Sequence, residues 1–269
     1  PRAPWEEWRT PVGRNRKKKG LPVHGWLNVD KPSDVTSTQV VGILKRLFNA
    51  QKVGHGGTLD PLATGLVVVL VGPATTLCDE VMAGEKRYTA EIDLLHTSPT
   101  DDREAEPVRT DAVRAPTLEE IESALPAFTG RIMQAPPAHS AMKVGGKRAY
   151  ELARAGKIDR LEPRPVLIHE LAVLEYAWPR LTLDIRCGKG TYIRSLARDL
   201  GQALGTGGML WRLRRTAVGR FDVADAASMD GLPRVLTQAD LRVIPEVEAI
   251  LQRRRDAQRP GPRRDPDPA

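Results

Sequence analysis

Apolar residues in this 269-residue chain fall into short runs and alternating patterns that predict a strand-rich domain. The segments with strand patterns are 22–29, 66–71, 86–96, 165–175 and 180–187. Apolar residues at helical spacing predict a helix over 37–48, capped by Thr36 or Ser37, and a second helix over 117–128, capped by Thr117. Together these elements predict an α/β (α+β) fold in which helices flank a sheet.

Between two of these elements lies a Gly-rich loop, Val53-Gly-His-Gly-Gly-Thr-Leu-Asp-Pro-Leu-Ala-Thr-Gly65, which has four glycines and one proline. This composition indicates a shaped loop, and the buried strand that follows can hold a polar group rigidly at the rim of a cleft. The polar group is Asp60, and His55 lies five residues before it. Because Asp60 precedes Pro61, helical dihedrals are disfavoured at the aspartate. The alternative is that Asp60 only begins a turn at this proline.

A second Gly-rich turn, Gly188-Lys-Gly190, precedes a predicted helix. The apolar face of that helix would consist of Ile193, Leu196, Ala197 and Leu200. A G-x-G before a helix can bind phosphate, but neither a βαβ setting nor a downstream acidic ribose ligand supports a dinucleotide site here.

The segment 130–156 combines glycines, a proline pair and several bases. The bases are Lys143, Lys147, Arg148 and Arg154. This composition suits a mobile RNA-contacting loop followed by a helix, and the alternative is a plain surface hairpin.

The net charge of +7 is unevenly distributed. Residues 1–20 carry +5 and residues 250–269 carry +3, so the body of the chain carries −1. Within the body, residues 186–220 hold eight Lys or Arg and one acidic residue, Asp199, whereas residues 91–106 hold six acidic residues and one Arg. A local basic face of this kind, rather than the overall charge, predicts a polyanionic partner.

Composition excludes several other classes of protein. Cys78 and Cys187 lack metal-ligand spacing, and the five histidines are scattered, so no metal site is expected. No apolar run approaches the roughly 20 residues of a membrane helix, and the N-terminus has no hydrophobic signal core. The expectation is a cytoplasmic protein with no membrane contact.

Four stretches match the motifs of one family. The loop around Asp60 fits G-H-x-G-T-L-D-P-x-A-x-G, Lys86-Arg-Tyr88 fits K-x-Y, and Gly190-Thr-Tyr-Ile-Arg-Ser-Leu196 fits G-T-Y-I/V-R-S/T-L. Asp30-Lys-Pro-Ser-Asp-Val-Thr-Ser37 fits D-K-P-x-G-x-T-S, with Asp34 in place of the glycine. These motifs resemble those of the tRNA pseudouridine-55 synthases, the TruB family. The resemblance covers roughly residues 21–245. It implies the pseudouridine-synthase fold, whose central sheet is mixed and largely antiparallel, with an RNA-binding insertion at about 130–156.

The resemblance implies three catalytic residues. Asp60 is the carboxylate, which either adds to the uracil ring or acts at C1′ of the ribose. Arg194 pairs with this carboxylate as a fixed, permanently charged partner. Tyr88 stacks on the target base and helps to remove the proton from C5.

Further residues are implied in substrate binding. His55 would wedge into the RNA loop, Tyr192 would pack beneath the base, and Leu213 would close the uracil pocket. Lys31 would brace the site, unless it is a solvent lysine at a turn. Lys143 and Arg148 belong to the RNA-contacting insertion. His139 stands where the family usually has an aromatic residue, and Thr100-Asp-Asp102 matches a family element of unclear duty.

By resemblance, the chain isomerises uridine to pseudouridine at position 55 in the T-loop of tRNA, after flipping the target base out of the loop. No cofactor and no obligate protein partner are expected; the expected partner is the tRNA T-arm, and the expected state is a monomer. The expected organisation is a basic disordered arm (1–20), a catalytic domain (21–249) and a disordered tail (250–269) without a PUA module. The alternatives are a non-catalytic tRNA-binding or folding protein of the same fold, a guide-RNA-dependent relative, and a glycosidase.

Overall fold

The structure is a computed structural model that describes residues 20–111, 114–140, 142–158, 161–243 and 245, without the side chains of 143, 144, 147, 148, 150 and 154. The predicted basic arm, apart from Gly20, and the predicted tail therefore lie outside the described residues. The strands are β1 (Gly25–Lys31), β2 (Val53–His55), β3 (Thr64–Val71), β4 (Lys86–Asp93), β5 (His96–Thr97), β6 (Val108–Arg109), β7 (Gly130–Gln134), β8 (Lys143–Val144), β9 (Lys147–Arg148), β10 (Arg164–Ala177), β11 (Arg180–Cys187), β12 (Met209–Val218), β13 (Phe221–Asp222) and β14 (Ala227–Ser228). The α-helices are α1 (Ser37–Leu47), α2 (Cys78–Ala83), α3 (Leu118–Ala124), α4 (Ala149–Arg154) and α5 (Ile193–Ala203).

Within the described residues, ten strands form one sheet, in which eight run in the order β14-β1-β3-β12-β4-β11-β10-β7. Strand β2 pairs with β3, and β13 pairs with β12. The pairs β1–β14 and β3–β12 are parallel, and the other pairs in this sheet are antiparallel. The prediction of a mixed, largely antiparallel sheet with helices is thus confirmed.

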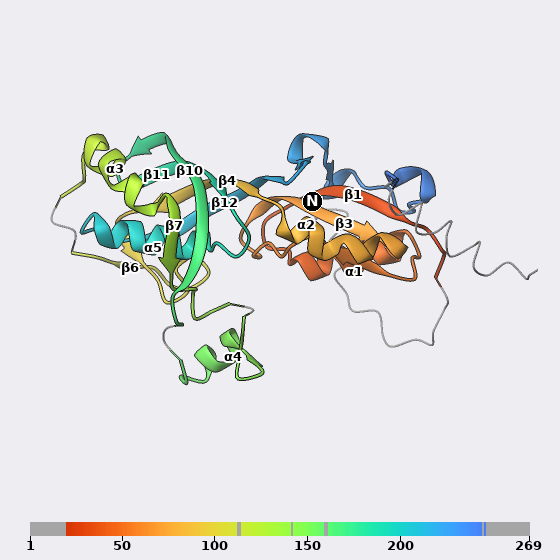
Figure 1. Ribbon diagram of the computed structural model, residues 1–269, viewed down its shortest axis with the longest axis horizontal. Helices are drawn as coiled ribbons and strands as arrows, with labels where there is room; N and C mark the ends of the chain where they lie inside the picture. Colours follow the sequence, from red (N-terminus) through yellow and green to blue (C-terminus); the bar gives the residue numbers. More distant parts are fainter. Residues whose placement is uncertain (1–19, 112–113, 141, 159–160, 244, 246–269) are drawn as a thin grey trace, which may run out of the picture.

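The sheet has two halves that meet at β12 and β4 (Figure 1). Helices α1 and α2 lie with β1 and β3 in one half, and α3 and α5 lie with β10 and β11 in the other. Buried apolar residues from α1, α5 and the sheet join in one main cluster, which includes Leu44, Val67, Ile92, Leu183 and Leu196. Since β12 is parallel to β3 and antiparallel to β4, residues on these three strands can meet at the centre of the molecule.

The predicted helix caps form as the sequence indicates. In α1, Thr36 Oγ1 accepts a hydrogen bond of 3.1 Å from the backbone N–H of Gln39, and Gln39 Oε1 accepts one of 2.7 Å from Thr36 N–H. Thr117 and Glu120 make the same reciprocal box at α3. Helix α3 ends at Ala124, and a 3₁₀ turn (Leu125–Phe128) completes the predicted helix 117–128.

Other elements differ from the sequence-based expectation. The first five residues of segment 130–156 form β7, which pairs with β10 at the end of the sheet, so this part is not a loop. The rest of the segment includes the hairpin β8–β9 and α4, which lies away from the sheet (Figure 1). Strand β12, which carries Leu213, is absent from the predicted strands. No helix among the described residues is both long and apolar enough to cross a bilayer.

Candidate active site

Asp60 lies in the loop between β2 and β3, and its side chain is 35% exposed. The loop backbone is fixed on the side that faces α1. Ser37 Oγ donates to Leu59 O at 3.1 Å and accepts from Leu59 N–H at 2.8 Å. The carbonyl oxygen of Pro61 accepts a hydrogen bond of 2.8 Å from Asp34 N–H. These contacts hold the residues on both sides of the aspartate, so its carboxylate is presented by a rigid backbone.

Asp34 stands at the position of the glycine in the motif D-K-P-x-G-x-T-S, and its backbone adopts the conformation that this position requires. Its φ is +63°, in the left-handed region that glycine adopts without strain and that aspartate tolerates better than most residues. The turn is therefore kept, and the Asp34 N–H reaches Pro61.

Lys31 is completely buried at the end of β1. Its ammonium group donates to three carbonyl oxygens, those of Pro32 (2.8 Å), Val35 (2.6 Å) and Pro61 (3.0 Å). Burial lowers the pKa of Lys31 from 10.5 to about 8, although the neighbouring carboxylates of Asp34 and Asp60 oppose this shift. Lys31 is thus not a solvent lysine, and it tethers the residue that follows Asp60.

Arg194 faces Asp60 from the first turn of α5, and its side chain is 7% exposed. Its Nε lies 3.1 Å from Asp60 Oδ2, and its Nη1 lies 3.4 Å from Asp102 Oδ2. The same Nη1 donates to the carbonyl oxygens of Thr100 (3.2 Å) and His139 (3.1 Å). The guanidinium therefore has a fixed orientation, with one edge toward the Asp60 carboxylate.

The element Thr100-Asp-Asp102, whose duty the motif left open, holds the arginines of α5. Asp102 is almost fully buried, and its Oδ1 accepts hydrogen bonds from Thr100 Oγ1 (2.6 Å) and Glu104 N–H (2.9 Å). Burial raises the pKa of Asp102, while the hydrogen bond from Thr100 and the charge of Arg194 act in the opposite direction. Asp101 Oδ2 pairs with Arg198 Nη1 at 2.8 Å, one helical turn after Arg194.

Tyr88 lies on β4 with 9% of its surface exposed. Burial raises the pKa of Tyr88 to about 12, and the positive charge of Arg215 and a hydrogen bond from it offset part of this shift. The hydroxyl is therefore protonated at neutral pH. Leu213, on the neighbouring strand β12, is 7% exposed and packs in the main apolar cluster.

His55 ends β2 and is half-buried. Its Nδ1 accepts a hydrogen bond of 3.2 Å from the N–H of Gly57. Burial, followed by the positive charge of Arg215, lowers the pKa of His55, so the imidazole is neutral at physiological pH. The ring thus supports the turn before Asp60 with one nitrogen and keeps the other available.

Tyr192 caps α5 and is held by Gln134, the last residue of β7. Gln134 is 1% exposed; its Oε1 accepts from Tyr192 N–H at 2.8 Å, and its Nε2 donates to Tyr192 O at 3.1 Å. The guanidinium carbon of Arg164 lies 5.4 Å from the centre of the Tyr192 ring, and Arg164 Nη2 donates to Gly190 O at 2.9 Å. The Gly-rich turn before α5 is thereby fixed to both β7 and β10.

The segment that leaves β7 is also fastened to α5. Ala135 O accepts from Ser195 Oγ at 2.8 Å and from Arg198 Nη2 at 2.9 Å, and the backbone of His139 contacts Arg194 as described above. Lys143 and Arg148 pair through their backbones in the hairpin β8–β9, but their side chains lie outside the described residues.

Of the sequence-predicted site residues, the structure pairs Asp60 with Arg194 directly and fixes the loop of Asp60 through Lys31 and His55. Sequence reasoning missed Arg215 and Gln134. Arg215 lies two residues from Leu213 and shares the inward face of β12, but this relation is visible only once the strand itself is known. Gln134 had no signal of this kind, because its role depends on contacts between distant segments.

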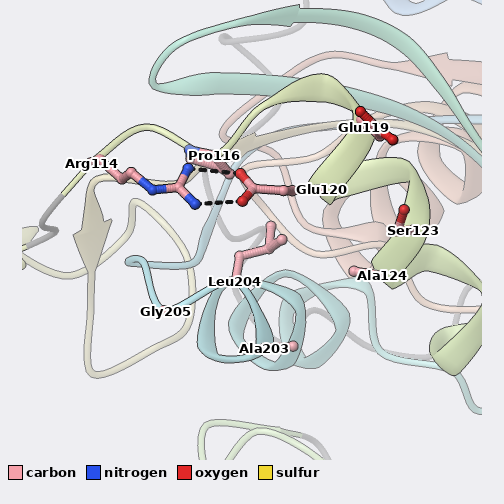
Figure 2. A pocket seen from close by; sticks show the side chains of 9 residues that line it. All are labelled: Arg114, Pro116, Glu119, Glu120, Ser123, Ala124, Ala203, Leu204 and Gly205. Carbon is pink, nitrogen blue, oxygen red and sulfur yellow. Dashed lines mark hydrogen bonds and ion pairs between the residues drawn. The ribbon is translucent and has the colours of Figure 1, made fainter.

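A cavity of 660 Å³ lies elsewhere, between α3 and the C-terminal end of α5 (Figure 2). Arg114 and Glu120 form an ion pair at its rim, and Leu204 points into the space between the two helices. None of the predicted site residues lines it. We therefore take the surface around Asp60, and not this cavity, as the candidate site. Among the described residues, no group of three or more His, Cys, Asp or Glu side chains could hold a metal ion.

Comparison with known proteins identifies the family of the chain. Residues 45–193 match the family model described as the TruB family pseudouridylate synthase N-terminal domain, and residues 194–252 match that of the tRNA pseudouridylate synthase B C-terminal domain. The chain is 47% identical over 228 residues to a protein of Rhodopseudomonas palustris named tRNA pseudouridine synthase B, covering 84% of this chain and 62% of the relative. It is 48% identical to a protein of Gluconacetobacter diazotrophicus with the same name, covering 80% of this chain and 70% of the relative.

Solved structures show a similar fold. A crystal structure of a Cbf5–Nop10–Gar1 complex contains a chain that is 28% identical, with a TM-score of 0.59 over 76% of this chain and 52% of that chain. An archaeal box H/ACA Nop10–Cbf5 complex contains one that is 25% identical, with a TM-score of 0.57 over 82% of this chain and 59% of that chain. Since the matched family model covers more than half of the sequence, the chain belongs to the TruB family of pseudouridylate synthases.

Proposed function

We propose that this protein isomerises uridine to pseudouridine in tRNA, with Asp60 as the catalytic carboxylate. Family membership and the relatives named tRNA pseudouridine synthase B support the reaction and the substrate class. The single structural observation that carries the assignment is the contact of 3.1 Å between Asp60 and Arg194, at a loop that is rigid yet leaves the carboxylate 35% exposed.

The isomerisation breaks the bond between N1 and C1′, turns the uracil and rejoins it to C1′ through C5. A carboxylate beside the ribose and the base can attack the ring or C1′, and in both cases it needs a fixed counter-charge in a desolvated pocket. Arg194 provides that charge, and its ion pairs with two carboxylates and its hydrogen bonds to two carbonyl oxygens keep the guanidinium in place. Tyr88 stacks on the base, Tyr192 packs beneath it, and Leu213 closes the apolar side of the pocket.

The substrate is the uridine at position 55 in the T-loop of tRNA, which has to leave the loop before reaction. Eversion of a base costs a few kcal/mol, and a side chain that fills the vacated space offsets part of this cost. His55 takes this role: its imidazole is neutral and supported by Gly57, so it can enter the RNA without carrying a charge. The insertion that carries α4 closes over the T-arm.

The protein acts alone, as a cytoplasmic monomer, and its catalytic domain spans residues 21–249, between the basic segments 1–20 and 250–269. Its identity to the bacterial relatives, at 47–48%, is higher than its identity to the chains from multi-protein complexes, at 25–28%. The chain spans 62% of the first of those relatives, so the activity of the whole protein is part of the proposal. A non-catalytic RNA-binding role would not require a half-exposed carboxylate held against an arginine.

Mapping of pseudouridine in tRNA tests the proposal. We expect the native protein to convert the T-loop uridine, and the variant Asp60→Asn to bind tRNA without forming pseudouridine, because the amide keeps the shape and loses the nucleophile. Turnover by Asp60→Asn within about tenfold of native, or about 1.4 kcal/mol in barrier, would exclude Asp60 from the chemistry. Conversion at another site only would reject the T-loop assignment.

A further inference from the structure

Arg215 on β12 is almost completely buried, with 1% of its surface exposed, and the proposed function assigns it no role. Its guanidinium binds the Gly-rich loop that carries Asp60. Nη2 donates to Gly57 O at 3.1 Å, Nη1 donates to Thr58 O at 3.2 Å, and Nε donates to Leu66 O at 2.7 Å. One side chain therefore connects the loop before Asp60 to the strand after it.

The register of the sheet places Arg215 between the loop and Tyr88. Arg215 is paired with Tyr88 across β12–β4 and with Gly65 across β12–β3. Gly65 has a φ of +101°, and a Cβ there would lie 2.3 Å from the carbonyl oxygen of Arg215. The two strands thus approach each other closely at this point, and a larger residue at position 65 would push Arg215 away from β3.

Arg215 carries a buried positive charge that no carboxylate among the described residues neutralises. Its three hydrogen bonds to the loop and to β3 all go to carbonyl oxygens, and among the described residues no carboxylate forms an ion pair with it. A buried cation without a carboxylate is costly, and a neutral donor could bind a carbonyl at lower cost. The charge acts on its neighbours. After burial, it is the next cause of the lowered pKa of His55 and of Lys86, and it offsets part of the rise that burial causes in the pKa of Tyr88.

We propose that Arg215 is a positioning residue for the reaction, which holds the loop of Asp60 in register with strand β4 and places a fixed positive charge at the hydroxyl of Tyr88. The inference rests on the proposed function, since it assigns Arg215 to the step in which C5 loses its proton. It differs from the role of Arg194, which contacts Asp60 itself.

The proton balance of the isomerisation shows why this charge matters. Pseudouridine carries a proton on N1 that uridine lacks, and C5 loses one, so the base neither gains nor loses protons overall. A tyrosine that accepts the C5 proton must first be anionic, having passed its own proton to N1 directly or through water. Burial opposes the anion, and the guanidinium of Arg215 stabilises it. Without this charge, removal of the C5 proton becomes the slow step.

Two variants separate the charge of Arg215 from its hydrogen bonds. Arg215→Lys keeps a cation and loses the three-way contact, whereas Arg215→Gln keeps an amide donor and loses the charge. Arg180→Lys is the matched control. Arg180 pairs with the buried Asp93 at 3.1 Å, five residues along β11 from the partner of Tyr88, which is roughly 16 Å in a strand. All are assayed in the full chain for tRNA affinity, thermal unfolding and single-turnover rate on tRNA with uridine or 5-deuterouridine.

We expect native and Arg180→Lys proteins to react at similar rates. Arg215→Gln should bind tRNA with native affinity, react at least about tenfold more slowly and show a primary isotope effect at C5 that native protein lacks. Arg215→Lys should be slowed with a smaller isotope effect. A native rate in Arg215→Gln would overturn the inference, and so would a slow reaction without an isotope effect, because that result places the defect at an earlier step.

Two further results keep the test decisive. If Arg215→Gln does not fold, Arg215→Lys is combined with Tyr88→Phe: a loss smaller than the sum of the two single effects supports action through Tyr88, and additive losses overturn it. If the native protein forms no pseudouridine while it binds tRNA, the proposed function fails, which is a different outcome from active native protein with an active Arg215→Gln variant.

Discussion

The ammonium group of Lys31 lies 3.0 Å from the carbonyl oxygen of Pro61, the residue that follows Asp60. A charged side chain without surface exposure thus supports the loop on one side, while Arg215 supports it on the other. Asp60 itself remains accessible between the two. The candidate site therefore combines a frame of buried cations with a carboxylate that is accessible from solvent.

Because the amine of Lys31 is buried, the free energy of unfolding should depend on pH in the alkaline range. Its folded pKa of about 8 lies below the ordinary value of 10.5, so between these values the unfolded chain binds more protons and the free energy of unfolding rises with pH. At about 1.36 kcal/mol per unit, the full gain is about 3.4 kcal/mol. Urea unfolding of the native protein and of Lys31→Met, measured from pH 7.5 to 10.5, isolates the contribution of Lys31 to the free energy of unfolding. A native-minus-variant difference that is constant with pH would contradict the prediction.

Arg194→Lys should slow the reaction by at least about tenfold, since a point charge cannot contact Asp60, Asp102 and two carbonyl oxygens at once. The control is Arg198→Lys, one turn later on α5, which loses contacts to Asp101 and Ala135 and should lose far less rate. Single-turnover rates at saturating tRNA are the measurement. Equal losses in the two variants would mean that any arginine on this helix face serves.

His55 should act without changing its charge. Because burial and Arg215 lower the pKa of His55 from its ordinary value of 6.5, its imidazole stays neutral from pH 7.5 to 8.5. We expect His55→Gln to react more slowly than native, by less than Asp60→Asn, and to show the same ratio to the native rate at each pH in this range. A ratio that changes with pH would indicate that the imidazole gains or loses a proton during the reaction.

Deletion of residues 1–20, which carry +5, should lower both tRNA affinity and its dependence on salt. Each lost phosphate contact reduces the salt slope by about one unit. The single-turnover rate on saturated complex should not change, because the arm makes no contribution to the chemistry. Deletion of 253–269, where three aspartates are interspersed among six arginines, should have a smaller effect. Equal slopes for full-length protein and residues 21–269 would show that the arm does not contact RNA.

Much of the fold could be predicted because its strands alternate and its helices carry caps. The predicted strand 180–187 coincides with β11, and its inward residues Leu181, Leu183 and Ile185 are completely buried. Strand β12 could not be predicted in this way. It has a buried arginine at an inward position, and register shifts between Leu210 and Arg212 and between Arg215 and Ala217 interrupt the alternation. A bulge and a buried charge each interrupt the alternation of apolar and polar residues from which a strand is predicted.

The contacts of the candidate site also fall into those that local motifs predict and those that they do not. The pairing of Asp60 with Arg194 was expected from motifs, since each lies in a contiguous stretch of distinctive residues. Contacts between chain segments were not expected: Gln134 holds the backbone of Tyr192 across 58 residues of sequence, and Arg215 reaches Gly57 across 158. Such contacts depend on the strand order of the sheet, which a local pattern does not contain.

The attachment of residues 134–139 to α5 sets a boundary for protein engineering. Four side chains, those of Gln134, Ser195, Arg198 and Arg194, join this segment to α5, the helix that carries Arg194 itself. A chimera that borrows the RNA-contacting loop of another enzyme should therefore take its donor sequence after His139. A graft that starts at Gly130 would replace β7 and the backbone contact of Arg194 with His139 together, and would alter the candidate site as well as the grafted segment.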